Sequence, residues 1–345
     1  MDRSFPTIGV AIIARNSSAT IGKALCSVRP IAAQIVVVDT GSTDATATIA
    51  TRLGAEVYFH RWTDDFSAAR NHALRYLRTN WVLVLDSDEA LDIPSLSAER
   101  HLLTHPHIGG IEVSIASVLG SGGAYHEHRY TRIFRRSPDI CFEGKVHEQI
   151  APSILAAGFE IVPSSIRIVH EGYRELNPEK IARNVALLEA ELAADPESVW
   201  HRYHLGLAEF ARGNLHRARQ LLDAVRISHQ LSEAQRELAT IRCAQCALAT
   251  DDLLGAEKLL AFTSPDQHRE GLRLFVLAGV LAAQQQFHAA AELLSMAPVC
   301  HSGLVEQDHR AAFVERLSEL ARYHRTPDPL ETVWNGKQRW QAIFR

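Results

Sequence analysis

A run of apolar residues from Trp81 to Leu85 ends in two carboxylates one residue apart, in the sequence Asp86-Ser87-Asp88. The run is too short for a typical helix and is typical of a strand buried on both faces of a mostly parallel sheet. Such sheets bind ligands at the carboxyl ends of their strands, and alternate strand side chains point the same way. Mg²⁺ or Mn²⁺ between the carboxylates would relieve their repulsion and favours phosphate oxygens as further ligands. The pattern indicates a metal-bound diphosphate, although Asp-x-Asp is also common in solvated turns.

A second carboxylate, Asp39, ends the apolar run Ile35–Asp39. In a doubly wound sheet the ends of the two runs can face one crevice. Asp39 could accept a hydrogen bond from a base N–H or a ribose hydroxyl. An ordinary aspartate at a strand end or helix cap is the alternative.

Two polar side chains, Arg70 and Asn71, fall in the first turn of a helix that Ser67 could cap. An arginine there is mildly disfavoured by the helix dipole, which a bound anion or base would offset. A surface ion pair with Asp64 or Asp65 is the alternative reading.

The segment Phe142–Glu148 offers acid–base side chains, and His170 follows another apolar run. A carboxylate near a metal diphosphate could deprotonate an acceptor, and a neutral imidazole could complete the shell of the metal. Taken without context, His147 and Glu148 are more typical of surface residues than of catalysts.

Other residue patterns in the sequence give weaker indications of a functional site. Cys243 and Cys246 lie on one face of an expected helix without a second pair to complete a zinc site, so we interpret them as small core residues. His126-Glu127-His128 has no HExxH continuation, and the sequence has no Gly-x-Gly-x-x-Gly, Walker loop or nucleophile elbow.

The elements that must position these residues alternate between strand and helix over residues 1–120, which predicts an open parallel sheet with helices on both faces. The runs 111–118, 129–134, 146–150 and 161–170 then predict mixed strands and loops. The expected strands are Ile8–Ala14, Ile35–Asp39, Glu56–His60 and Trp81–Leu85, and the expected helices are Ala19–Val28, a segment through about Leu53, and Ser67–Arg78.

From about Asn177 the sequence changes to successive helices with an internal repeat. The pattern of Leu215, Ala218, Leu221 and Leu222 recurs after 38 residues and again, beginning at Phe287, after a further 34. The second offset is the tetratricopeptide period. Stacked helical hairpins of this kind bury faces that no hairpin can bury alone. A generic helical bundle is the alternative.

Composition narrows the class of function. The chain has 345 residues, 46% hydrophobic, with net charge −4 and five cysteines. About two domains fit this length, and no basic field favours nucleic acid. The odd cysteine count fits a reducing cytosol. We expect no signal peptide and no transmembrane helix, hence a cytoplasmic protein, while peripheral association with the inner membrane face stays open.

With these residues assembled, the chain resembles the family 2 glycosyltransferases, in particular a bacterial branch with a tetratricopeptide tail. That branch includes sublancin-type peptide glycosyltransferases and lipopolysaccharide core glycosyltransferases. The segments that carry the resemblance are IVVVDTGSTDAT (35–46), DDFSAARNHAL (64–74), WVLVLDSDE (81–89), RIFRR (132–136), FEGKVHE (142–148) and HEGY (170–173). Ser17 departs from the Glu common in relatives.

The resemblance implies a GT-A fold with a Rossmann-like, mixed and mostly parallel sheet, followed by all-α tetratricopeptide-like repeats. It implies domains over residues 1–175 and 176–325 and a tail over 326–345. By position it implies nucleotide contacts by Asp39 and Arg70, with Arg15, Asn71 and Asp86 alongside. It implies Asp86, Asp88 and His170 as metal ligands, Asp88 being the more direct, and Glu148 as catalytic carboxylate. For that last role Glu143 and Glu171 stay open.

The resemblance further implies an inverting transferase that uses Mn²⁺ or Mg²⁺. It would move a hexose or N-acetylhexosamine from a nucleoside-diphosphate sugar, usually a UDP-sugar, to a peptide, lipopolysaccharide or glycan. The repeats would hold the acceptor, recruit a protein partner or self-associate. The rival hypotheses are an inactive nucleotide-sugar-binding scaffold and a nucleotidyltransferase.

Overall fold

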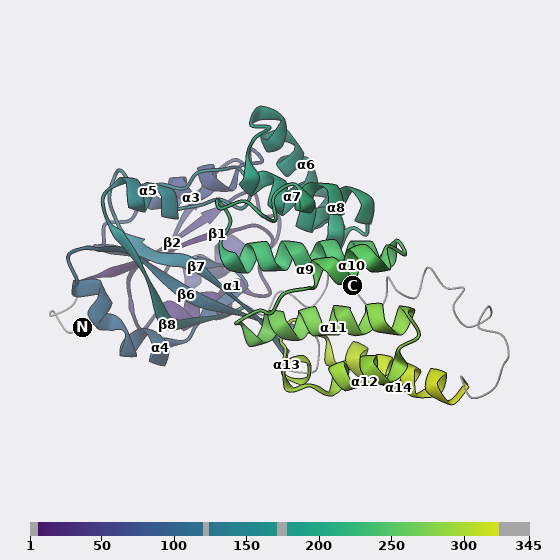
Figure 1. The fold of residues 1–345 in the computed structure, drawn as a ribbon. Coiled ribbons are helices and arrows are strands. Elements are labelled where there is room, and N and C mark those ends of the chain that lie inside the picture. The colour runs from purple at the N-terminus through teal and green to yellow at the C-terminus, as the bar shows by residue number, and fades with distance from the viewer. Residues whose placement is uncertain (1–5, 120–123, 171–177, 324–345) are drawn as a thin grey trace. The chain divides into compact units, whose positions relative to one another are not determined.

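The computed structural model describes residues 6–119, 124–170 and 178–323. The first part of the chain builds one sheet, part of which is labelled in Figure 1. Its eight strands lie in the order β3-β2-β1-β4-β7-β6-β8-β5. The strands are β1 (Ile8–Ala14), β2 (Ala32–Asp39), β3 (Glu56–Phe59), β4 (Trp81–Asp86), β5 (Glu89–Leu91), β6 (Ile108–Leu119), β7 (Ala124–Arg135) and β8 (Glu160–His170).

Pairing in this sheet is mixed and mostly parallel. Strands β3, β2, β1 and β4 run parallel to one another, as do β6 and β8. Strand β7 is antiparallel to β4, and β5 is antiparallel to β8. The carboxyl ends of β2, β1 and β4 therefore meet at one rim of the sheet, where ligands of such sheets bind.

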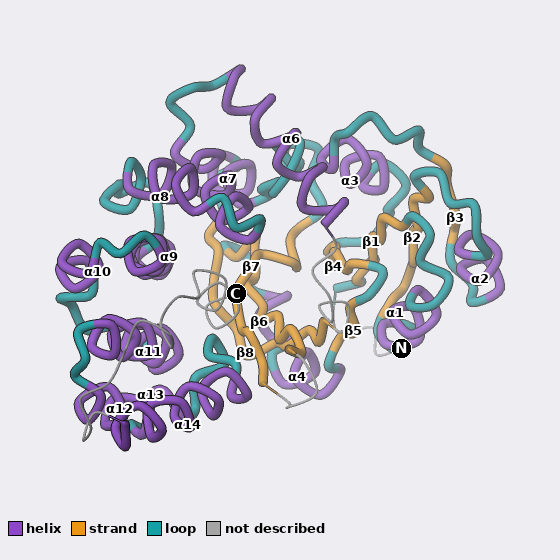
Figure 2. The backbone as a smooth tube through the Cα atoms, turned by 90° about the vertical axis from the view of Figure 1, so that its right-hand side faces the viewer, coloured by secondary structure: helices purple, strands orange, loops and turns teal. Residues whose placement is uncertain are grey.

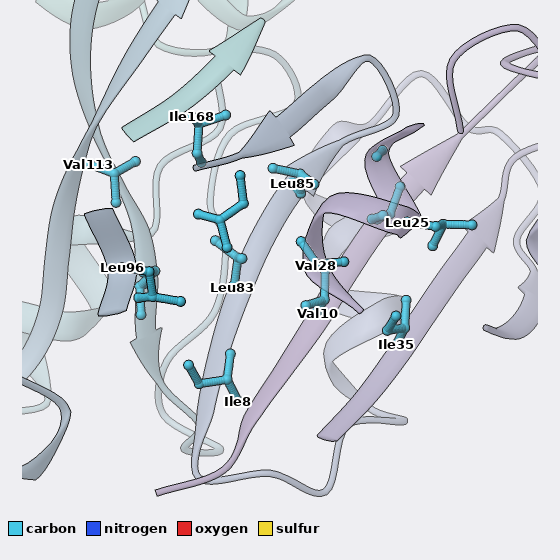
Figure 3. Close-up of a cluster of buried hydrophobic side chains, with 14 of the residues drawn as sticks. Ile8, Val10, Leu25, Val28, Ile35, Leu83, Leu85, Leu96, Val113 and Ile168 are labelled. Atoms are coloured by element: carbon cyan, nitrogen blue, oxygen red, sulfur yellow. The ribbon is translucent and has the colours of Figure 1, made fainter. Parts of the chain in front are cut away.

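Helices cover both faces of the sheet. One apolar cluster joins alternate residues of β1, β2 and β4 to α1 (Ile21–Val28), α2 (Thr46–Arg52) and α4 (Ile93–Ala98) (Figure 3). The other face packs on α3 (Phe66–Leu74) and α5 (Ala151–Ala156). A short 3-10 helix, η1, spans Arg100–Thr104. Because both faces are covered, these strands are apolar along their whole length rather than alternating.

The expected sheet with helices on both faces is confirmed, with local corrections. The run 146–150 forms no strand of its own, and only an isolated bridge joins Glu143 to Gln149. The helix cap expected at Ser67 is wrong. Asp65 caps α3 by accepting the Ala68 N–H at 2.8 Å. Ser67 lies inside the helix and donates its hydroxyl to the Gly144 carbonyl at 2.6 Å instead.

The second part of the chain, from α6 onward, consists of helices joined by loops over its described residues, as Figure 2 shows. Its helices are α6 (Pro178–Ala194), α7 (Val199–Ala211), α8 (Leu215–Asp223), α9 (Glu233–Ala249), α10 (Leu253–Leu259), α11 (Gln267–Ala283), α12 (Phe287–Ser295), α13 (Ala297–Cys300) and α14 (Gln307–Tyr323). Three hairpins, α7–α8, α9–α10 and α11–α12, match the repeat in the sequence. Since Ala218, Ala256 and Ala290 are all completely buried at the same phase, the tetratricopeptide-like repeat is confirmed.

Small residues also recur on the first helix of each hairpin. Gly206 on α7 is followed at the repeat offsets by Ala244 and Ala278, both completely buried. A Cβ added at Gly206 would lie 2.7 Å from Leu222 Cδ2 on α8. The glycine therefore allows the two helices of the first hairpin to approach more closely than a side chain would permit.

Contacts divide the chain into two compact units. The first holds the described residues up to His170 except Ala124, and the second holds Ala124 and the described residues from Pro178 onward. Cys243 and Cys246 are buried in the helical unit, where burial raises the pKa of Cys243 to about 12, in keeping with small core residues. None of the helices in the described ranges is both long and apolar enough to cross a membrane. The expected tail over 326–345 lies outside the described residues, as does Glu171.

Candidate active site at the rim of the sheet

The acidic turn follows β4 at the rim, where the sequence places it. β4 ends at Asp86, and Ser87 and Asp88 form a turn before β5 begins at Glu89. The chain leaves strand geometry at this turn, so strand alternation no longer fixes the relative directions of the Asp86 and Asp88 side chains. Each carboxylate instead meets its own partners.

Asp86 faces two arginines. Its Oδ1 accepts a hydrogen bond from Arg70 Nη2 at 2.9 Å, and its Oδ2 accepts one from Arg132 Nη2 at 3.1 Å. Arg70 belongs to α3, Arg132 to β7, and the side chains of both are largely buried. Three elements distant in sequence therefore converge on one carboxylate at the rim.

Arg70 also binds Glu148, since its Nε donates to Glu148 Oε1. Its guanidinium lies 5.6 Å from the centre of the Phe142 ring. The third nitrogen, Nη1, is buried and has no hydrogen-bond partner in the described part of the chain. An unsatisfied buried donor is costly, so this nitrogen points to a ligand or water that completes the arrangement.

The loop that carries Glu148 is tied to α3. Asn71 accepts the Phe142 N–H at 2.8 Å and donates to the Phe142 carbonyl at 2.9 Å. His147 has a positive φ of 53°, which turns the loop just before Glu148. With both groups of its amide engaged, Asn71 supports the site by fixing this loop, and its contact with a nucleotide stays a prediction.

Arg132 and Glu89 belong to the site although sequence reasoning did not single them out. Arg132 Nη2 lies 2.9 Å from Glu89 Oε1, and Glu89 Oε2 accepts the Asp86 N–H at 2.8 Å. The Glu89 side chain is only 2% exposed. The available signal was a third carboxylate directly after Asp-x-Asp, since a buried charge requires a partner of opposite sign.

These contacts determine which side chains of the site are charged. Burial would raise the pKa of Asp86, but Arg132 and Arg70 hold it well below its usual range. Burial raises the pKa of Glu89 to about 7, with Arg132 opposing the shift. Burial would lower the pKa of Arg70, yet Glu148 and Asp86 raise it above its ordinary value. Asp86 is therefore ionised and both arginines are charged at neutral pH.

The sequence-predicted metal ligands divide into two groups. Asp88 Oδ2 and His170 Nε2 lie 3.2 Å apart because β5 and β8 pair with Glu89 opposite His170. Asp86 contacts the arginines instead, and the described residues hold no cluster of three or more His, Cys, Asp or Glu suited to a metal. A carboxylate and an imidazole that are both partly accessible fit two positions on Mn²⁺ or Mg²⁺, which leaves further positions for phosphate oxygens or water.

Asp39 ends β2 at the same rim, but its side chain lies on the face of the sheet opposite to that of Asp86. It lies in register with Ala14, whereas Asp86 lies in register with Ile13, and adjacent side chains of a strand alternate between faces. Asp39 Oδ1 accepts the N–H groups of Gly41 and Ser42 at 2.8 and 2.7 Å. The exposed Arg15 follows β1, the strand between them. Arg70 is bound to Asp86 and not to Asp39.

Residues 9–155 match the model of the family named Glycosyl transferase family 2. A TPR repeat-containing protein of Synechococcus elongatus is 35% identical over 149 residues, 43% of this chain and 36% of that protein. The prophage-derived glycosyltransferase SunS of Bacillus subtilis is 29% identical over 203 residues, 56% of this chain and 47% of that protein. The chain thus spans between a third and a half of the length of these curated relatives.

Among solved structures, S. aureus TarS 1–349 is similar over 81% of this chain and 91% of that one, at 19% identity and a TM-score of 0.37. A likeness of this size carries no functional conclusion. Residues 9–155 therefore match a family 2 glycosyltransferase domain, and the observed sheet has the expected GT-A arrangement, followed by tetratricopeptide-like helices.

Proposed function

We propose that this chain is an inverting, metal-dependent glycosyltransferase that moves a hexose or N-acetylhexosamine from a nucleoside-diphosphate sugar, usually UDP-linked, to a peptide, lipopolysaccharide or glycan. The observation that carries the proposal is the acidic turn at the carboxyl end of β4, with Arg70 on Asp86 and His170 on Asp88. The family match supports the class of reaction.

In this proposal Asp88 and His170 hold Mn²⁺ or Mg²⁺, and Asp86 lies beside them as the second acidic residue of the turn. A bound divalent cation would act as a Lewis acid and neutralise charge on the departing diphosphate. Asp39 accepts hydrogen bonds from the base or ribose of the donor. Arg70 contributes its buried Nη1, which lacks a partner among the described residues. Arg15 and Asn71 flank the nucleotide.

Glu148 acts as the general base. It removes the proton of the acceptor hydroxyl as that oxygen attacks the anomeric carbon, and a single displacement inverts the centre. Arg70 engages its Oε1, and its Oε2 accepts no hydrogen bond within the described residues. That second oxygen is available to take a proton from the acceptor.

The first test is the Asp88→Ala variant in a donor-hydrolysis and transfer screen over nucleotide sugars, with and without Mn²⁺. We expect loss of turnover with the fold retained by circular dichroism, because the proposed metal loses its carboxylate ligand. Asp139→Ala, at an exposed aspartate after β7, is the matched control. Undiminished turnover in Asp88→Ala, or in wild-type enzyme stripped by EDTA, would remove the metal from the proposal.

The repeats favour a second role, because stacked helical hairpins present extended surfaces to partners. We propose that they hold the acceptor or a protein partner, or self-associate. An inactive scaffold that binds nucleotide sugars and recruits a partner is the alternative for the whole chain. Calorimetry with UDP and Mn²⁺, combined with the hydrolysis screen, separates the two: binding without any turnover would favour the scaffold.

A further inference from the structure

Arg132 on β7 bridges two carboxylates of the candidate site. One nitrogen, Nη2, lies 3.1 Å from Asp86 Oδ2 and 2.9 Å from Glu89 Oε1. We propose that Arg132 and Glu89 form a positioning pair that fixes the direction of the Asp86 carboxylate for the nucleotide donor. The inference rests on the proposed function and adds two residues to it.

Glu89 is the buried member of this pair. Its side chain is 2% exposed, while that of Arg132 is 14% exposed. A buried carboxylate without a cation costs several kcal/mol, so Glu89 requires Arg132. Glu89 in turn accepts the Asp86 N–H at 2.8 Å, which fixes the backbone at the point where β4 ends. The pair therefore holds the turn at its base.

The side chain of Asp86 is held by two arginines. Arg70 holds one oxygen from α3 and Arg132 holds the other from β7. A carboxylate held at both oxygens and at its own backbone N–H cannot rotate freely. The Asp86 side chain nevertheless remains 34% exposed, so a ligand can reach it. A fixed and accessible carboxylate is what preorganised recognition requires.

A purely structural role predicts a different outcome from a positioning role. If Arg132 only neutralises Glu89, then removing Arg132 when Glu89 is already uncharged should not change nucleotide affinity. If Arg132 also directs Asp86, the double variant still lacks that contact. Loss of Arg132 in the Glu89→Gln background therefore isolates the Arg132–Asp86 contact from the need of Glu89 for a cation.

The experiment uses full-length wild-type protein, Arg132→Met, Glu89→Gln and the double variant Arg132→Met/Glu89→Gln. Urea unfolding is measured for each, together with calorimetric binding of UDP, GDP and dTDP in MnCl₂. We expect Arg132→Met to lower the urea midpoint and the double variant to recover most of that loss. We expect the double variant to bind the preferred nucleotide about tenfold more weakly than Glu89→Gln, a change of about 1.4 kcal/mol.

A surface pair serves as the matched control. Arg316 and Glu319 lie 2.6 Å apart with side chains 38% and 45% exposed. Since exposed ion pairs contribute little, Arg316→Met/Glu319→Gln should leave both the urea midpoint and the nucleotide affinity at wild-type values.

Two outcomes overturn the inference while the proposed function stands. An unchanged urea midpoint in Arg132→Met shows that Glu89 does not depend on Arg132. Equal nucleotide affinity in Glu89→Gln and the double variant shows that Arg132 does not direct Asp86. If the wild-type protein binds none of the three nucleotides, the proposed function fails and the positioning role falls with it, whatever the unfolding data show.

Discussion

Arg70 links the proposed donor site to the proposed general base, since it contacts Asp86 on one side and Glu148 on the other. A group that bridges a carboxylate proposed to bind the donor and a proposed base allows each to respond to the other. Such a coupled set of charges is best separated by isosteric substitutions that remove one charge and keep the shape.

The substitution Glu148→Gln tests the proposed general base most directly. The amide keeps a hydrogen-bond acceptor for Arg70 but cannot take up a proton, so we expect sugar transfer to fall about 10²–10⁴-fold. Donor binding, measured separately by calorimetry, should be retained. Transfer at the normal rate would instead move the base to Glu143 or Glu171, whose Gln variants are the natural comparisons.

The ion pair between Glu270 and Arg273 should make the stability of the fold depend on pH. Burial opposes ionisation of Glu270, but the hydrogen bonds from Arg273 and the Ser264 N–H outweigh it and lower the pKa of Glu270. A depressed pKa stabilises the fold above the unfolded value, 4.5, and that stabilisation is lost as the pH falls through the lower folded value.

Glu270→Gln should therefore cost about 1–3 kcal/mol of unfolding free energy at pH 7, as expected for a hydrogen bond between charged groups. The cost should shrink steadily as the pH falls below the unfolded pKa. Urea unfolding at a series of pH values measures it, with Glu292→Gln at an exposed position as control. A cost that is the same at every pH would contradict the assigned ion pair.

At the scale of elements, close packing between paired helices decides which glycines tolerate a methyl group. Gly22 on α1 would place a Cβ 3.9 Å from its nearest neighbours, an ordinary contact, whereas Gly206 would meet Leu222 at 2.7 Å. Leu222 is completely buried and cannot move aside. The same substitution should thus have opposite effects at the two positions.

Gly206→Ala should lower stability by about 1 kcal/mol, because overpacking of about 1–3 kcal/mol exceeds the gain in helix propensity of about 1 kcal/mol. Gly22→Ala should raise it by about 0.5–1 kcal/mol. Thermal and urea unfolding of the two variants make the comparison. A gain at both positions would show that α7 and α8 are not held together at Gly206.

Much of this architecture follows from local pattern. Strand β1 spans Ile8–Ala14 as the sequence predicts, since a buried apolar run between polar residues allows few other structures. The pairing of Arg132 with Glu89 was not predictable in this way, because the two residues lie 43 positions apart and meet only when β7 packs beside β4. The start of α3 was also not predictable in this way. Asp65 rather than Ser67 caps the helix, and propensity does not decide between two neighbouring cap residues.

At the scale of the whole molecule, the family match and the folded sheet end at different residues. The match ends at residue 155, but β8 spans Glu160–His170 and pairs with both β6 and β5. The proposed metal ligand His170 therefore lies beyond the matched segment. Without β8, the strands β5 and β6 would each lose a partner.

Two fragments test this limit. Residues 1–155 should be insoluble or unfolded, because exposed edges of β5 and β6 favour aggregation. Residues 1–175 should fold and hydrolyse donor, if the repeats serve the acceptor. Circular dichroism and solubility give the first result, and the hydrolysis screen gives the second. A folded and active 1–155 fragment would remove β8 and His170 from the site.

The opposite orientations of Asp39 and Asp86 restrict the size of any molecule that contacts both. One strand, β1, separates them, so their backbones lie about 10 Å apart across two strand spacings. An occupant must pass over the end of β1 and approach each carboxylate from a different side. Inorganic pyrophosphate is too short for this path, whereas a nucleotide is long enough, so pyrophosphate should compete with the donor far more weakly than UDP does.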